Sequence, residues 1–336
     1  MGLSERAKLY SELENERHSK VIVYATSTRQ GMEAQIAKDI LPKFVEHLDR
    51  IGRSNRISLV LYTNGGDTSV AWSLVNLIRS FCDEFEVIVP ANCYSCGTLI
   101  CLGANNIVMT KQAFLGPIDP STNGVYNPTR QLPNGAAMPL PVSVESVRAY
   151  MEMAKNDFDI KDQKYLTEIF LKLSEKIHPL ALGDVYRSKS QIKMFAKRLM
   201  HWQHLGKKQE QKIINFLCSE SGSHDYPIRR KEAKDDLGLN IEKPSEELYR
   251  IIKGIYDDIC ADMELDNPFN PVAILQGKPL CSYKCKRCII ESVDYGSDFL
   301  STDGQLALQG IQVANTIVYE GCNSSLIFPV PKRPWQ

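Results

Sequence analysis

Short runs of β-branched and apolar residues alternate with helix-length amphipathic segments over the first third of the chain, and this alternation limits the fold more than any other feature. The runs lie at residues 21–24, 57–62, 85–90 and 106–109, and each has the length of a buried strand. Between the first three runs, residues 32–51 and 69–81 carry apolar side chains at helical spacing. Repeats of this kind fold as a parallel sheet covered by helices. The sequence therefore predicts an α/β fold.

The rest of the chain divides into segments of different character. We predict an N-terminal arm over the charged residues 1–18, a main domain over residues 19–264 and a cysteine-containing tail over residues 265–336. Within the main domain, residues 120–143 are rich in Pro, Gly and Asn, which indicates a loop at the rim of a site. Residues 144–217 predict helices that are broken at Pro179 and Gly183. In the tail, residues 289–293 have a strand-like pattern.

Charge and hydropathy exclude several classes of function. Lys plus Arg and Asp plus Glu both number 40, so no basic field points to nucleic acid. No apolar run reaches the length of a membrane-spanning helix. The N-terminus has no apolar signal-peptide core, so we expect a cytoplasmic protein without a membrane segment. In that reducing compartment the ten cysteines are expected to be thiols rather than a disulfide framework.

Ser95 stands where a reactive group can be placed in a parallel sheet, because ligands bind at the carboxyl ends of such strands. It follows the third run and precedes an apolar helical segment. A serine there faces backbone N–H groups and the positive end of the helix dipole, which suits a nucleophile. Serine is also a favoured helix N-cap, and locally the cap is the simpler interpretation.

Gly65 and Gly66 follow the second run, at the same edge of the predicted sheet. A glycine pair lets the backbone approach a substrate closely and present N–H groups to a carbonyl oxygen. Taken alone, the pair indicates a simple tight turn. Its convergence with Ser95 at one edge is the main structural argument for an active site.

A wider resemblance changes the balance between these interpretations. Residues 59–67, residues 91–97 and the string Leu-Gly-Pro-Ile-Asp-Pro at 115–120 resemble the Clp-protease/crotonase superfamily. Within it the chain most resembles the serine dehydrogenase proteinase family, a relative of signal peptide peptidase A. Residues 177–183 and 223–228 also look like that family, and the resemblance spans roughly residues 20 to 240. It implies ββα superhelical units with a parallel sheet, helical additions and a tendency to form homo-oligomers.

The resemblance also implies roles for the residues at the two turns. Ser95 matches the position of the nucleophile. Gly66 and Cys96 match the residues whose backbone N–H groups form the oxyanion hole, and Gly65 precedes them in the same turn.

The general base is harder to assign, because a serine hydroxyl needs a neighbour that takes its proton. The histidine that follows the nucleophile in the Clp subunit is replaced here by residues 118–119. His224 precedes a segment that resembles the helix next to the catalytic aspartate in that family, so we predict His224 as the base, oriented by Asp119 or Asp225. His224 could also belong to a turn that caps the following helix. Lys155 has the spacing of the lysine used by signal peptide peptidase A, but its charged context favours a solvated surface position.

Cysteines in the tail form the only pattern that suggests a metal. Cys281, Cys285 and Cys288 have the spacing C-x3-C-x2-C, which matches one iron–sulfur pattern, and Cys322 would complete a four-thiolate zinc site. Because no cofactor fold accompanies these residues, we treat them as weak candidates and predict neither metal nor cofactor.

The sequence thus predicts a serine endopeptidase that acts through an acyl-enzyme on Ser95, with a peptide or protein as its substrate. A second hypothesis is an inactive scaffold of the same fold that binds peptides by strand addition, and the absent Clp-type histidine favours it. A third is coenzyme A chemistry on this fold, but no adenine site is evident and that chemistry does not need a hydroxyl at position 95.

Overall fold

The computed structural model describes residues 3–118, 121–122, 124–131, 135, 137–140, 142–220, 223, 225–310 and 312–326. The chain forms two compact units. Unit 1 comprises Met1–Gly116, Leu199–His204 and Pro227–Gln336, and unit 2 comprises Pro117–Arg198 and Leu205–Tyr226. The predicted boundaries at residues 18 and 264 fall inside unit 1 and stay predictions. No helix in the described part of the chain is both long and apolar enough to cross a membrane.

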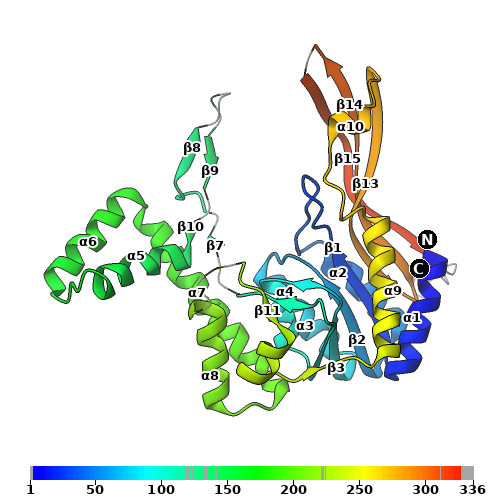
Figure 1. Cartoon of the computed structure of the whole chain (residues 1–336), viewed down its shortest axis with the longest axis horizontal. Coiled ribbons are helices and arrows are strands. Elements are labelled where there is room, and N and C mark those ends of the chain that lie inside the picture. Colours follow the sequence, from blue (N-terminus) through cyan, green and yellow to red (C-terminus); the bar gives the residue numbers. More distant parts are fainter. Residues whose placement is uncertain are drawn as a thin grey trace, which may run out of the picture. The chain divides into compact units, whose positions relative to one another are not determined.

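Unit 1 is built on an eight-stranded sheet with the order β12-β5-β3-β2-β1-β13-β14-β15 (Figure 1). Its parallel half consists of β1 (Lys20–Thr26), β2 (Ser54–Tyr62), β3 (Cys82–Val89), β5 (Asn106–Met109) and β12 (Ile241–Glu242). The four strands predicted from the alternation are all present, so the predicted α/β fold with a parallel sheet is confirmed. Their carboxyl ends form one edge, which carries the candidate site.

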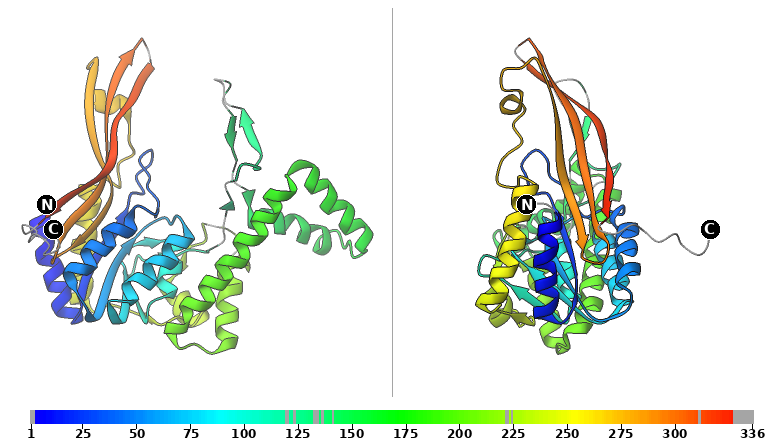
Figure 2. Two further views of the ribbon diagram at one scale, coloured as in Figure 1. Left: turned by 180° about the vertical axis from the view of Figure 1, so that it is seen from behind. Right: turned by 90° about the vertical axis from the view of Figure 1, so that its right-hand side faces the viewer.

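Helices cover both faces of this sheet. Each crossover from β1 to β5 leads to the next strand in the same direction, so the connecting helices lie on one face. These are α2 (Ile40–Ile51), α3 (Thr68–Arg79) and α4 (Cys96–Leu102). The other face is covered by α1 (Leu3–Arg17) and α9 (Glu246–Asp262), which lie side by side (Figure 2). The segment predicted as an arm therefore contains a packed helix, with Tyr10 and Leu13 in the core.

Two predicted helix limits differ from the structure. The helix expected from Met32 begins only at Ile40, because Ile36 is buried through backbone pairing with Gly66 rather than through a helical face. Gly183 does not break the helix that contains it, since α7 runs without interruption from Pro179 to Leu199. Pro179 does stand at a boundary, because its fixed φ suits the first turn of a helix.

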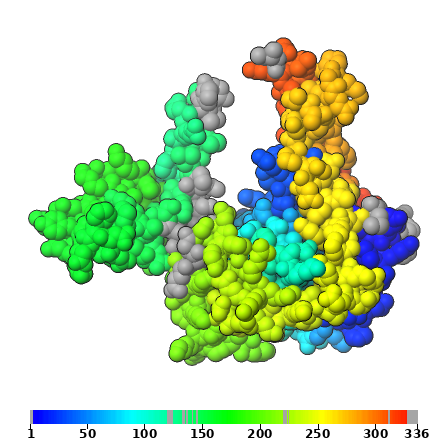
Figure 3. All heavy atoms as spheres, viewed as in Figure 1, coloured from blue at the N-terminus to red at the C-terminus, as the bar shows by residue number. Residues whose placement is uncertain are grey.

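The tail extends the sheet with antiparallel strands. These are β13 (Leu280–Ser292), β14 (Gly296–Gln309) and β15 (Gln312–Leu326), and α10 (Pro271–Leu275) precedes them. We call β13, β14 and β15 the ribbon. Because β13 runs antiparallel to β1 and pairs Cys288 with Thr26, its first half continues past the carboxyl end of β1. That half of the ribbon projects from the rest of unit 1 (Figure 3).

Smaller strands complete unit 1, and unit 2 is mainly helical. Strands β4 (Asn92–Cys93), β6 (Phe114–Leu115) and β11 (Ile228–Arg229) form a separate small sheet beside the carboxyl edge. In unit 2, the helices are α5 (Val144–Asn156), α6 (Gln163–Lys176), α7 and α8 (Lys207–Asn215). The predicted rim loop contains the short strands β7 (Ser121–Thr122), β8 (Thr129–Gln131), β9 (Ala137–Pro139) and β10 (Val142–Ser143).

Candidate active site

Ser95 has a strained backbone at the start of α4. Its φ is 52° and its ψ is −118°, a combination outside the ordinary left-handed region and rarely adopted by residues with a side chain. The Ser95 hydroxyl makes no capping hydrogen bond to the helix. The structure therefore does not support the helix-cap interpretation of Ser95. Strain of this kind is kept where the position of a side chain matters.

Gly65 and Gly66 form the neighbouring turn, and both need to be glycine. Their φ values are +106° and +151°, which residues with a Cβ rarely adopt. A Cβ on Gly65 would lie 2.8 Å from the Cβ of Ser95. A Cβ on Gly66 would lie 2.3 Å from the carbonyl oxygen of Ile36. The turn is therefore packed between the Ser95 turn and the chain around Ile36.

Backbone pairing fixes the direction of the Gly66 N–H. Ile36 donates to the carbonyl of Gly65 at 2.9 Å and accepts from the N–H of Asp67 at 2.8 Å. In a parallel bridge of this form, the residue between those two partners turns its own N–H and C=O away. The Gly66 N–H consequently points away from the Ile36 segment and is not used in that pairing.

Cys96 supplies a second N–H of the same kind. It is the first residue of α4, and the first N–H groups of a helix have no partner within the helix. Within the described part of the chain, neither the Gly66 N–H nor the Cys96 N–H donates to a backbone carbonyl. The Cys96 N–H also lies at the positive end of the helix dipole, although α4 is short. Two unused N–H donors near one hydroxyl are what stabilisation of an oxyanion requires.

The turns are tied together by further contacts. The N–H of Thr63 donates to Asn92 O at 3.2 Å, and the N–H of Tyr94 donates to Thr63 O at 3.0 Å. This pairing joins the end of β2 to the segment that leads to Ser95. The strand ends are thereby held in a fixed register.

Thr98, in the first turn of α4, holds the start of this helix in place by hydrogen bonds. Its buried hydroxyl lies 2.9 Å from the carbonyl oxygen of Cys93 and 2.8 Å from that of Gly116, and it accepts from the Gly116 N–H at 3.0 Å. A Cβ on Gly116 would lie 2.1 Å from the ring of Tyr94. The Leu-Gly part of the string at 115–120 is thus explained by packing next to the Ser95 turn.

The cysteines beside Ser95 are packing residues. Cys93 and Cys96 are fully buried, and burial raises the pKa of both thiols above the ordinary value. The Sγ atoms of Cys93 and Cys101 lie 3.7 Å apart. A thiol that resists ionisation is a poor nucleophile, so these groups do not compete with the Ser95 hydroxyl.

Of the residues predicted to take part in the proton transfer, Lys155 and Asp225 are among the described residues. His224 and Asp119 lie outside the described residues. Lys155 is an exposed residue of α5 in unit 2, and Asp225 is also exposed. The assignment of the base therefore stays a prediction.

A buried histidine with a serine and an aspartate occurs elsewhere in unit 1. His47 Nδ1 lies 2.7 Å from Ser292 Oγ, and His47 Nε2 lies 3.5 Å from Asp298 Oδ2. All three residues are at most 1% exposed. Because no substrate could reach Ser292, we interpret this group as a structural link between α2 and the ribbon.

The tail cysteines are spread over the ribbon. Cys281, Cys285 and Cys288 lie along the extended strand β13, and Cys322 lies on β15. Cys288 and Cys322 pair with the same residue, Leu300, from opposite sides. No three His, Cys, Asp or Glu side chains in the described ranges are arranged to hold a metal ion.

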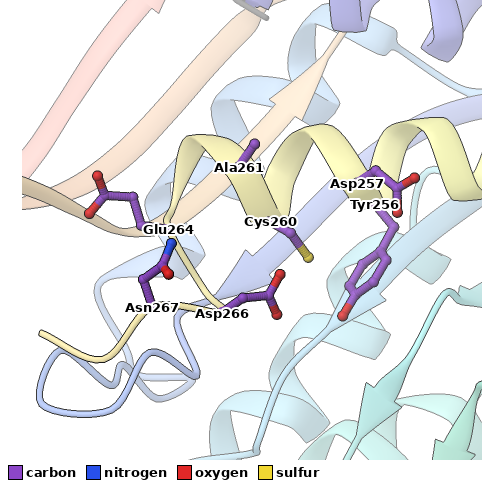
Figure 4. Close-up of a pocket in the computed structure, with 7 residues that line it drawn as sticks. All are labelled: Tyr256, Asp257, Cys260, Ala261, Glu264, Asp266 and Asn267. Carbon is purple, nitrogen blue, oxygen red and sulfur yellow. The ribbon is translucent and has the colours of Figure 1, made fainter.

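Unit 1 also has an acidic cavity that the sequence patterns did not indicate. Its volume is about 310 Å³ and it lies at the carboxyl end of α9 (Figure 4). The Tyr256 ring stands 5.3 Å from the ring of Tyr62, at the end of β2. Three carboxylates give the cavity its charge, and of these Glu264 pairs with Arg29 and Asp257 with Lys253. The lining residues are Tyr256, Asp257, Cys260, Ala261, Glu264, Asp266 and Asn267.

Similar sequences occur in an archaeon. The uncharacterized proteins MJ0137 and MJ1495 of Methanocaldococcus jannaschii are 28% and 24% identical to this chain over 261 and 251 residues. The alignments cover 74% and 71% of this chain, and 77% and 72% of the two relatives.

Solved structures with some likeness are those of proteases. A variant of the 1510-N membrane-bound stomatin-specific protease aligns with a TM-score of 0.38 at 15% identity, and covers 69% of this chain and 85% of that one. ClpP1 from Listeria monocytogenes aligns with a TM-score of 0.36 at 14% identity, and covers 71% and 99%.

A family model matches the part of the chain that forms β1, β2, β3, β5 and both turns. The model describes the ClpP-like SDH-type serine proteinases and matches residues 2–129. The matched segment contains Gly65, Gly66 and Ser95, and is similar to the ClpP-like SDH-type serine proteinases.

Proposed function

We propose that the protein is a serine peptidase that cleaves peptide bonds through an acyl-enzyme on Ser95. The observation that carries the proposal is the strained backbone of Ser95, which is packed against Gly65 and does not use its hydroxyl as a helix cap. The match of residues 2–129 to the model of a serine proteinase family gives this strain a chemical interpretation. The substrate is a peptide or protein.

The reaction has two steps, acylation of Ser95 and hydrolysis of the acyl-enzyme. The Ser95 hydroxyl gives its proton to a base while its oxygen attacks the substrate carbonyl, and the oxyanion that forms accepts from the N–H groups of Gly66 and Cys96. Collapse of this intermediate breaks the C–N bond, and the leaving amine takes the proton from the base. Water then attacks the ester by the same route and releases the second product.

We propose His224 as the base, with Asp119 as the group that orients its imidazole. The support is the sequence resemblance of the segment around His224. Lys155 is the alternative base. A lysine acts as a base only when burial lowers its pKa. Because Lys155 is exposed in α5, this requirement favours His224.

A fluorophosphonate probe tests the proposal, because it forms a covalent bond only with an activated serine. Ser95 is expected to be the labelled residue in peptide mapping, and Ser95→Ala is expected to remove the label. Ser73→Ala is the matched control, because Ser73 is an exposed helical serine of the same unit that donates to Ser69 O. Loss of labelling in His224→Ala but not in Lys155→Ala would identify the base.

The main alternative is a scaffold that binds peptides without cleaving them. It predicts peptide binding that survives Ser95→Ala and no labelling of the wild-type protein at Ser95. The absence of label at Ser95 under any condition would contradict the peptidase. Self-association, which the family resemblance implies, is a separate proposal and is tested by the mass of the purified protein in solution.

A further inference from the structure

One loop joins the proposed oxyanion turn to the C-terminal ribbon. We call residues 27–39, between β1 and α2, the β1–α2 loop. Near its end, Ile36 holds the Gly66 turn through the hydrogen bonds to Gly65 and Asp67 described above. Ile36 is 1% exposed and has no freedom to move away from its surroundings. The direction of the Gly66 N–H therefore depends on where the loop holds Ile36.

The start of the loop is fixed to β13. The N–H of Ser27 donates to the carbonyl of Arg287 at 2.8 Å. The N–H of Ala34 donates to the carbonyl of Ser27 at 2.9 Å, so the loop folds back on its own start. This return brings residues 33–34 next to the strand that carries Arg287.

The guanidinium of Arg287 closes the same connection from the side. It donates through Nη2 to the backbone carbonyl of Glu33, three residues before Ile36. Through Nη1 it donates to Thr302 Oγ1 at 3.2 Å, and it pairs with Glu320. One planar group thereby ties the loop to β14 and β15 at once, through N–H donors that are held in a fixed fork.

An irregularity in β13 explains how Arg287 reaches the loop. Lys286 pairs with Ser301 and Cys288 pairs with Leu300, so the register shifts between them. Arg287 is the extra residue of a β-bulge. A bulge takes one residue out of the ladder and redirects its side chain, and bulges are frequent next to active sites.

Arg29 anchors the first part of the loop to the same tail. Its side chain is 7% exposed, donates through Nε to Asn267 O at 2.7 Å and pairs with Glu264 at 2.6 Å. Its Nη1 also donates to Cys285 Sγ at 3.4 Å. Arg29 holds the loop seven residues before Ile36, whereas Arg287 holds it three residues before.

We propose that Arg287 is a positioning residue for the oxyanion hole, which acts through Glu33 and Ile36 on the N–H of Gly66. The proposal rests on the function proposed for Ser95. If it is correct, the ribbon, which lies outside the matched residues 2–129, helps to hold the Gly66 turn in position. A merely structural Arg287 would stabilise the ribbon and leave the Gly66 turn unaffected.

Hydrogen exchange in the full-length protein tests the positioning without reference to activity. Arg287→Ala is expected to raise the exchange rates of the Ile36 and Asp67 amides by about tenfold or more, because the loop loses its anchor. Lys284→Ala is the matched control, since Lys284 lies on the same strand and pairs with Asp303 at 3.5 Å. In the control these two amides are expected to exchange as in the wild type.

The kinetics of fluorophosphonate labelling give the second readout. In Arg287→Ala the maximal rate of labelling at Ser95 is expected to fall about tenfold with an unchanged half-saturating probe concentration, less than the roughly 10²–10³ lost with a whole oxyanion donor. Arg287→Lys is expected to recover part of this loss, because an ammonium can still donate to the Glu33 carbonyl. If Arg287→Ala does not fold, Arg287→Lys carries the test, with a loss of about threefold against none in Lys284→Ala.

Two results would overturn the proposal. One is unchanged exchange of the Ile36 and Asp67 amides in folded Arg287→Ala. The other is faster exchange of both amides with an unchanged rate of labelling. If the wild-type protein is not labelled at Ser95, the proposed function fails, while the exchange rates still decide whether Arg287 holds the turn.

Discussion

Gly65 and Ser95 lie so close together that no side chain fits between them. A Cβ on Gly65 would lie 2.8 Å from the Cβ of Ser95 and 3.3 Å from its Oγ. The turn after β2 and the turn after β4 are therefore in direct contact, and each limits the conformation of the other. The strain in the Ser95 backbone is maintained by this contact rather than by α4 alone.

A substitution at position 65 should consequently have a large effect on the reactivity of Ser95 and a small effect on the free energy of unfolding. We expect Gly65→Ala to lower the rate of fluorophosphonate labelling by at least about 100-fold, because the new methyl group displaces the Ser95 side chain from the N–H donors. The left-handed backbone adds a cost of about 1–2 kcal/mol to the free energy of unfolding. The labelling rate and urea unfolding of the same samples measure both effects.

Gly52→Ala separates the two contributions. Gly52 has a φ of +69°, but nothing lies within 4 Å of the place where a Cβ would stand. It should lose about 1–2 kcal/mol of stability and keep the wild-type labelling rate. Equal loss of labelling in both variants would show that backbone strain alone accounts for the effect.

Substitutions at Thr98 test how much its buried hydrogen bonds contribute to stability next to Ser95. We expect Thr98→Val to lower the free energy of unfolding by about 1–3 kcal/mol, because the Gly116 N–H and two carbonyl groups lose their buried partner. Thr98→Ser keeps the hydroxyl and should restore most of the hydrogen bonds. Urea unfolding of the two variants is the measurement. A larger loss in Thr98→Ser than in Thr98→Val would mean that the methyl group, and not the hydroxyl, matters here.

The parallel strands were predictable because their patterns are local. Each of the four predicted runs is buried over most of its length, so continuous apolar residues were a sufficient signal. The start of α2 was not predictable in this way. Ile36 fits the apolar period of the following helix, but its burial comes from pairing with Gly66, a contact that no local pattern contains.

Most of the ribbon was missed for a related reason, since the predicted strand-like residues 289–293 overlap only the end of β13. Much of β15 and the first half of β13 face solvent, so polar residues interrupt the apolar alternation that identifies strands. The cysteine spacing in β13 attracted a metal interpretation instead. The role proposed for Arg287 depends on a bulge, which pairing with β14 reveals and sequence does not.

Glu242 should make stability depend on pH. Burial raises its pKa, but the two hydrogen bonds from Arg17 and one from Asn106 outweigh burial and hold the pKa below its ordinary value of 4.5. A lowered folded-state pKa means that the contribution is present at neutral pH and is lost as the pH falls below about 4.5. The urea midpoints of the wild type and Glu242→Gln should therefore differ less as the pH falls from about 6 to about 3, which is roughly the range over which such a carboxylate titrates. Glu84→Gln, at an exposed ion pair with Arg56, is the control and should show a small gap throughout.

Arg6 holds the N-terminal helix by an ion-pair cluster with almost no exposure to solvent. Its guanidinium pairs with Asp258 of α9 and Glu291 of β13, both at 2.7 Å, and Tyr10 donates to the same Glu291. Arg6→Met should lower the free energy of unfolding by about 3–5 kcal/mol, because it leaves buried carboxylates without their cation. Urea unfolding monitored by circular dichroism measures this loss.

The control for Arg6 is a pair of the same chemistry on the surface. Arg53 pairs with Asp83 at 3.1 Å, with side chains 79% and 62% exposed, so Arg53→Met should change stability by no more than about 0.5 kcal/mol. A loss below about 1 kcal/mol in Arg6→Met would instead mean that the helix can detach and that water then reaches the carboxylates. The large loss would establish residues 3–17 as part of the folded unit that holds the sheet.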